Sequence, residues 1–172
     1  GDTIKARKIL IEQAQRLLAS HQNQIDIAYL YVFLGKTYIH DGKFKKAVKY
    51  LKASQAIYKS MDSFSKISLQ AITSFYLGVI AYETDNLIDA NRLLKEAEEL
   101  ISRYCYRSTR TYAMVLFYLA KVNYHQNNVS LANECAVKAN GIFQNTLISK
   151  DHPWLLCSEI LLGYLKDASM DS

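Results

Sequence analysis

The sequence predicts an all-α solenoid of about eight antiparallel helices, stacked into a right-handed superhelix. Its 172 residues include one proline and six glycines, which is too few turn-forming residues for a β-sandwich or a doubly wound sheet. Half of the residues are hydrophobic, which suits one continuous core. Two sets of marker residues recur with a period of 42 or 43 residues. This period indicates repeated helix pairs.

The first marker is a small residue that directly follows a leucine in the first helix of each repeat. Its members are Gly35, Gly78, Ala120 and Gly163. Glycine inside a helix costs up to about 1 kcal/mol relative to alanine, so we expect another helix to approach closely at these positions. The second marker is an alanine of the second helix, which would present the facing small surface. It occurs at Ala47, Ala90 and Ala132.

The markers and the turn residues predict eight helices in order along the chain. Their approximate ranges are 3–20, 25–40, 44–60, 65–83, 87–104, 109–125, 129–147 and 153–167. The helices of each pair are separated by polar pairs, because Gly, Asn and Asp accept positive φ. These pairs are Asp41-Gly42, Asp85-Asn86 and Asn127-Asn128. Pro153 suits the first turn of the last helix.

Three full repeats, at about 25–147, are flanked by half repeats. The first helix of the chain would be a lone second helix of a preceding repeat, and the last would be a lone first helix. We therefore expect a single repeat domain over residues 1–172 that is a piece of a larger protein.

The first repeat carries a recognisable set of residues at fixed spacing. They are Tyr31, Leu34, Gly35, Tyr38, Ala47 and Leu51. This pattern resembles the tetratricopeptide repeat family, and the resemblance covers roughly residues 28–164. The period exceeds the family's usual length of about 34 residues, as in the repeats of kinesin light chain and related adaptors. The resemblance implies a non-catalytic scaffold that binds a peptide or helix of a partner protein.

The resemblance also implies that the first helices line a concave binding face. When Ala28, Ala71 and Ala113 are counted as position one, the groove positions are two, five, nine and twelve. The candidate partner-binding residues are Tyr29, Val32, Lys36, Ile39, Ile72, Phe75, Val79, Tyr82, Met114, Phe117, Lys121 and Tyr124. The last helix adds Cys157, Ile160 and Tyr164. We expect a protein or peptide with hydrophobic anchors and acidic residues, although an equally open alternative is that these side chains form core.

Two ligand specificities of the family are not expected. Its carboxylate clamp for chaperone tails needs Lys, Asn and Arg at set groove positions. This sequence offers Val32, Lys36, Tyr76, Met114 and Tyr118 there. Kinesin light chain has paired asparagines along the groove, where this chain has aromatic stretches, so its cargo specificity is not expected either.

No catalytic, zinc-binding or phosphate-binding motif is present, so we expect no enzyme activity, no metal and no cofactor. His40 and His125 occupy equivalent positions near the ends of first helices, where a histidine suits the helix dipole. A run of seven lysines predicts a solvated helix face rather than a nucleic-acid surface, since Ala47, Val48 and Leu51 form an apolar stripe and the lysines occupy the opposite face of the helix. The run consists of Lys43, Lys45, Lys46, Lys49, Lys52, Lys59 and Lys66.

No apolar run approaches the roughly 18 residues of a membrane span, so no membrane insertion is expected. The three cysteines, Cys105, Cys135 and Cys157, form no motif and are expected to be small core residues. Unpaired cysteines suit a reducing compartment such as the cytoplasm. Two other functions remain open: a peptide-sensing domain of a larger signalling or transcription regulator, and a self-associating spacer in a multiprotein assembly.

Overall fold

A computed structural model describes residues 2–19, 24–61, 64–104, 109–146, 149 and 151–170. Within these ranges the chain forms helices and no strand. The helices are α1 (Asp2–Ala19), α2 (Gln24–His40), α3 (Phe44–Lys59), α4 (Phe64–Glu83), α5 (Leu87–Tyr104), α6 (Arg110–His125), α7 (Val129–Thr146) and α8 (Pro153–Met170). The predicted all-α solenoid is confirmed, and the helix ends agree with the predicted ones to within a few residues.

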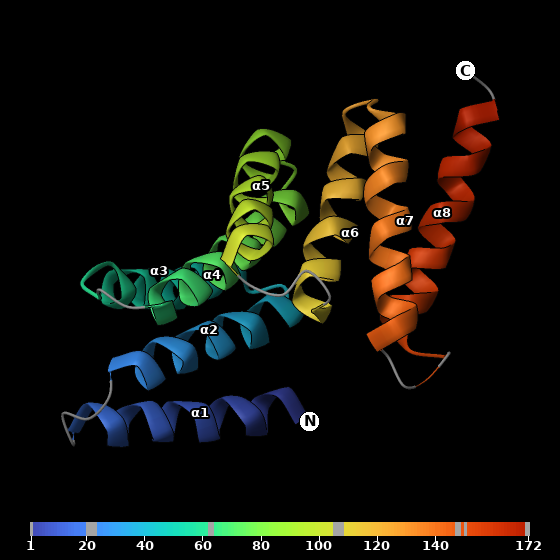
Figure 1. Ribbon diagram of the computed structural model, residues 1–172. Coiled ribbons are helices and arrows are strands. Elements are labelled where there is room, and N and C mark those ends of the chain that lie inside the picture. The colour runs from blue at the N-terminus through green and yellow to red at the C-terminus, as the bar shows by residue number, and fades with distance from the viewer. Residues whose placement is uncertain are drawn as a thin grey trace.

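The first helices of the repeats lie on the inner side of the stack. Helix α2 contacts α4, α4 contacts α6, and α6 contacts α8, whereas the described residues of α3, α5 and α7 make no comparable contacts with one another. Each second helix instead packs between the first helix of its own repeat and that of the next. The helix axes turn from nearly horizontal in α1 and α2 to upright in α6, α7 and α8 (Figure 1). The stack is therefore curved, and α2, α4, α6 and α8 follow its inside.

The turns inside the three repeats share one geometry. A positive φ occurs at Gly42 (68°), Asp85 (60°) and Asn127 (61°). In each turn the backbone N–H of the next residue donates a hydrogen bond to the carbonyl oxygen of the residue five positions before it. The N···O distances are 2.9, 2.8 and 2.8 Å in the three repeats. This pattern is a Schellman closure, in which a left-handed residue ends the helix and satisfies its last carbonyl groups. The predicted role of the polar turn pairs is confirmed.

The small-residue marker lies at the closest approach of the paired helices. A Cβ atom on Gly35 would lie 2.9 Å from Leu51 Cγ, and one on Gly78 would lie 2.8 Å from Leu94 Cγ. In the third repeat the equivalent positions carry Ala120 and an alanine in place of the leucine, both fully buried. The small residue therefore leaves room for the side chain of the paired helix. A glycine faces a leucine in the first two repeats, and two alanines take their places in the third.

Two expectations about polar and small residues have different outcomes. Six of the seven lysines in the run are exposed, and Lys66 is half-buried, as a solvent-facing helix surface requires. Cys135 is buried, but Cys157 is exposed, and the prediction that it is a core residue is wrong. Cys157 lies on α8, which has no later helix packed on it among the described residues. Cys105 lies outside the described residues.

An ion pair attaches α1 to the α2–α3 turn. Arg7 Nη1 lies 2.5 Å from Asp41 Oδ2, and the guanidinium also lies over the Tyr38 ring at 4.8 Å from its centroid. The Arg7 side chain is nearly buried, at 7% exposure. The hydrogen bond from Arg7 lowers the pKa of the Asp41 carboxyl below its ordinary value of 3.8. Ionised Asp41 therefore stabilises the docked position of α1.

Replacing Asp41 with asparagine is expected to loosen α1 at neutral pH, because buried Arg7 loses its charged partner. The pKa of Asp41 is lower in the folded chain than in the unfolded one. The stabilisation of the fold by ionised Asp41 is therefore complete above pH 3.8 and is lost as the pH falls below that value. Thermal unfolding between pH 7 and pH 3 should show the difference between parent and variant shrinking at the acidic end. A difference that stays constant over this range, or an equal effect of the exposed control Glu12→Gln, would contradict the assignment.

Candidate functional site

A cavity of about 300 Å³ lies among the first helices of the three repeats. Of the predicted groove residues, α2 contributes Lys36 and Ile39, α4 contributes Phe75 and Val79, and α6 contributes Met114. Phe75 and Val79 are buried, at 1% and 4% exposure, and form the floor. Lys36 is exposed. The repeat geometry thus brings five predicted residues from three repeats around one space.

Four predicted residues lie elsewhere. Val32 and Phe117 are core residues, with 1% and 7% exposure, and the Phe117 ring packs edge-on against Trp154. Ile72 lines a separate cavity of about 150 Å³ beside the N-terminal half of α6. The Tyr29 hydroxyl donates to Ser68 Oγ at 3.3 Å, and Ser68 lines that second cavity too. These four residues occupy the same helical positions as Phe75 or Met114, which line the 300 Å³ cavity, but their surroundings are different.

The remaining three predicted residues belong to a cluster at the C-terminal ends of α4 and α6. Lys121 Nζ lies over the Tyr82 ring, 4.3 Å from its centroid, and 5.1 Å from the Tyr118 centroid. Burial lowers the pKa of Lys121, against the opposing effect of the Glu83 charge. Tyr124 is 38% exposed and borders His125 at the edge of the cluster. The Lys121 ammonium group thus already contacts aromatic rings, whereas the Lys36 side chain is exposed to solvent.

The predicted residues of α8 do not line the cavity. Cys157, Ile160 and Tyr164 are all exposed, and α8 reaches the cavity through Trp154 instead. Other lining residues that the groove positions missed are His40, Phe44, Tyr76, Glu83 and Tyr118. Tyr76 and Tyr118 occupy the position directly after Phe75 and Phe117. The recurrence of an aromatic pair in both repeats is the sequence signal that could have identified them.

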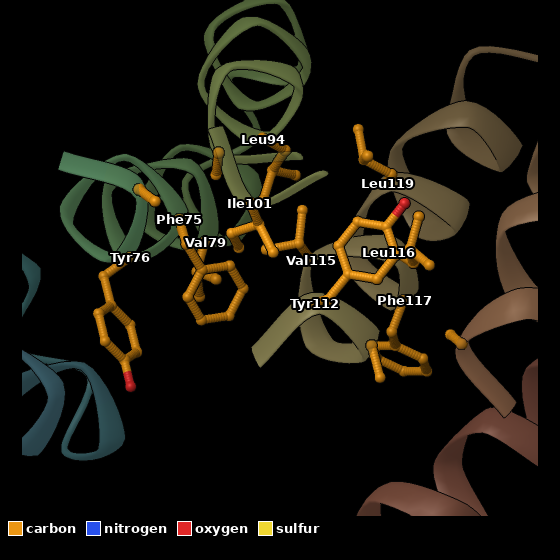
Figure 2. Packing of buried hydrophobic residues seen from close by; sticks show 14 of the residues in the cluster. Phe75, Tyr76, Val79, Leu94, Ile101, Tyr112, Val115, Leu116, Phe117 and Leu119 are labelled. Carbon is orange, nitrogen blue, oxygen red and sulfur yellow. The ribbon is translucent and has the colours of Figure 1, made fainter. Parts of the chain in front are cut away.

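The two missed tyrosines bring polar groups to an otherwise apolar space. Figure 2 shows Phe75, Tyr76 and Val79 emerging together from α4, with the Tyr76 ring extending away from Leu94 and Ile101 and its hydroxyl at the far end. Neither tyrosine hydroxyl hydrogen-bonds to a residue in the described ranges. Burial raises the pKa of Tyr76 and of Tyr118 to about 12. Both hydroxyls are therefore protonated at neutral pH and can donate to an acceptor placed in the cavity.

A basic edge separates this cavity from a second apolar hollow. Lys36 and His40 line both the 300 Å³ cavity and a neighbouring space of about 470 Å³ between α1 and α2. The second space is lined by Ile9 and Phe33, which are 56% and 48% exposed. The inner face of the stack therefore offers two apolar hollows with exposed basic side chains between them.

The described residues contain no group of three or more His, Cys, Asp or Glu side chains that could hold a metal ion. In the same part of the chain, no helix has the length and apolar character needed to cross a membrane.

Comparison with solved structures shows the fold. The chain superposes on BtubC (BKLC) from P. vanneervenii with a TM-score of 0.76 and 17% identity, over 99% of this chain and 66% of that one. It also superposes on the nearly identical TPR-like repeats of a kinesin light chain-like protein from Podosopora anserina, with a TM-score of 0.66 and 19% identity, over 99% of this chain and 81% of that one. The chain thus spans just under two thirds of BtubC. No protein-family model and no curated protein matches it in sequence.

Proposed function

We propose that this chain, which has the fold of a TPR-like helical repeat solenoid, is a protein-interaction scaffold that binds a segment of a partner protein on its inner face. The observation that supports this proposal is the 300 Å³ cavity to which all three repeats contribute side chains. A cavity of this size is at the lower limit for a small-molecule site. It suits one large apolar side chain of a peptide or helix.

The lining suggests the chemistry of the partner segment. An apolar or aromatic anchor would contact Phe75, Val79 and Met114, and a backbone carbonyl could accept from a tyrosine hydroxyl. Lys36 and His40 at the edge favour an acidic residue beside the anchor. These exposed charges would mainly set orientation and association rate, while burial of the anchor provides most of the affinity. The role is binding rather than catalysis.

A pair of equivalent positions provides a matched test. Met114 and Ile72 both occupy position two of a first helix and are both half-buried, but only Met114 lines the 300 Å³ cavity. Peptides selected against the parent chain from a random display library would be measured by calorimetry on Met114→Trp and Ile72→Trp. Met114→Trp fills the cavity and should weaken binding tenfold or more, equivalent to about 1.4 kcal/mol. Ile72→Trp should leave the affinity within about twofold.

Circular dichroism spectra of both variants should match the parent, so that a loss of affinity reports the cavity and not unfolding. The proposed function is wrong if the selected peptides bind Met114→Trp as tightly as the parent, or if only Ile72→Trp loses them.

A further inference from the structure

Helix α3, on the outer side of the stack, carries charges of one sign along its length. It contains five lysines and no acidic residue. Four of these lysines follow the spacing i, i+4, i+7, i+14 and therefore lie on one side of the helix. All four are exposed, and we call them the lysine stripe: Lys45, Lys49, Lys52 and Lys59. At 1.5 Å of helix per residue, the stripe is about 21 Å long.

The lysine stripe has no charged partner in the described part of the chain. None of its four ammonium groups forms an ion pair with a described acidic side chain. The acidic residue just before α3, Asp41, already pairs with Arg7 and Lys43. Like charges one helical turn apart repel each other. An anion bound along the stripe would relieve this repulsion.

The equivalent positions of the other two second helices are different. On α5 they carry Ile88, Arg92, Lys95 and Ser102, and on α7 they carry Ser130, Glu134, Val137 and Gln144. Arg92 pairs with Asp89 at 3.0 Å, and Glu134 pairs with Lys138 at 2.6 Å. The outer sides of α5 and α7 thus have neutral or internally paired side chains at these positions. The repeat fold therefore does not require a lysine stripe on α3.

The arrangement of the lysines indicates the shape of the anion. A lipid bilayer or a nucleic-acid duplex that covered the outer side of the stack would also meet Glu99 and Glu134, which are exposed on α5 and α7. The stripe instead follows a single line along one helix. In an extended peptide, every second side chain points the same way, at intervals of about 6.6 Å. This interval is comparable to the separation of successive stripe lysines from Lys45 to Lys52, which is about 6 Å and about 4.5 Å along the helix axis.

We propose that the lysine stripe of α3 binds an acidic segment of a partner protein in an extended conformation, with carboxylates of alternate residues facing the lysines. The site is independent of the 300 Å³ cavity, because no residue of the stripe lines that cavity. Exposed ion pairs are individually weak and are screened by salt. Binding therefore depends on several lysines acting together and is strongest at low ionic strength.

The probe is a labelled ten-residue peptide of alternating glutamate and serine, and fluorescence anisotropy would measure its binding to the whole chain. Raising the salt concentration from about 0.01 M to about 0.15 M shortens the screening length from about 30 Å to about 8 Å, and the affinity should fall about tenfold or more. The matched peptide of alternating glutamine and serine should not bind. Met114→Trp, which fills the inner cavity, should leave the affinity for the acidic peptide unchanged.

Two triple variants with the same net charge separate the stripe from overall charge. Changing Lys45, Lys49 and Lys52 to glutamine should weaken binding about tenfold. The control changes Lys5, Lys95 and Lys138 to glutamine, and should bind within about twofold of the parent. All six lysines are exposed, and glutamine suits a helix about as well as lysine, so the circular dichroism spectra of both variants should match the parent.

The proposal is overturned if the acidic peptide does not bind at millimolar concentration in low salt, or if the two triple variants lose affinity equally. Phosphatidylserine vesicles and a DNA duplex would be measured under the same conditions. Tighter binding of either one, lost in the variant of Lys45, Lys49 and Lys52, would also overturn it, since the occupant would then be a lipid surface or a nucleic acid.

Discussion

Phe75→Ala should lower the free energy of unfolding by about 3–5 kcal/mol, because it removes a buried aromatic ring from close-packed surroundings. Phe75 is 1% exposed, and its ring centroid lies 4.9 Å from that of Tyr76 and 6.0 Å from that of Tyr118. The ring therefore connects the second repeat to the third, and its loss should weaken both. Urea unfolding followed by helical circular dichroism would measure the change by linear extrapolation.

Phe33→Ala is the matched control, because Phe33 is also on a first helix but is 48% exposed. It should cost no more than about 1 kcal/mol. Similar losses for the two variants would mean that Phe75 is not packed between the repeats as described. The slope of the free energy against urea should stay unchanged, since a lower slope would indicate separate unfolding of individual repeats.

Gly78→Leu should destabilise the chain by about 1–3 kcal/mol or more, because it overpacks the contact between α4 and α5. Even the first added carbon would lie 2.8 Å from Leu94 Cγ and 3.3 Å from the Leu94 backbone nitrogen. Leu94 is fully buried, so its side chain cannot turn away into solvent. The midpoint of thermal unfolding should fall by several degrees. Gly163→Leu makes the same substitution at the equivalent position of α8 and should leave the midpoint unchanged or slightly raised, because leucine favours the helix over glycine.

The alanine pair of the third repeat suggests a rescue of the same contact. Gly78→Ala and Leu94→Ala should each destabilise the chain, whereas the double variant reproduces the combination of Ala120 and Ala136. The double variant should be more stable than the sum of the single changes predicts, by about 0.5–3 kcal/mol. Strict additivity in the unfolding experiment would show that the two positions do not share one space.

The helices and their ends could be predicted from the sequence because they depend on local chemistry. Gly42, Asp85 and Asn127 adopt the positive φ that their residue types tolerate best, so the turns could be located without knowledge of the neighbours. The spacing of Gly35 and Gly78 identified the contact with the second helix, since glycine is unfavourable in a helix without such a contact. Period and residue type together were sufficient for the fold.

The site was only partly predictable because equivalent positions do not have equivalent surroundings. Ile72 and Met114 share position two but line different cavities. Lys36 is exposed, whereas its equivalent Val79 is buried and Lys121 lies over aromatic rings. A periodic pattern describes an average repeat and contains no information on which neighbour covers each copy.

The sequence by itself determined the helical repeat, its period and the residues at the helix–helix contacts, all of which follow from backbone preference and side-chain size over short distances. Only the tertiary structure decided that Phe44, Tyr76 and Trp154 complete the cavity with the predicted residues, and that Gly163 is open where Gly78 is filled. The physical reason is curvature. The cavity depends on the angle between successive helix pairs, and that angle results from the combined packing of side chains far apart in the chain.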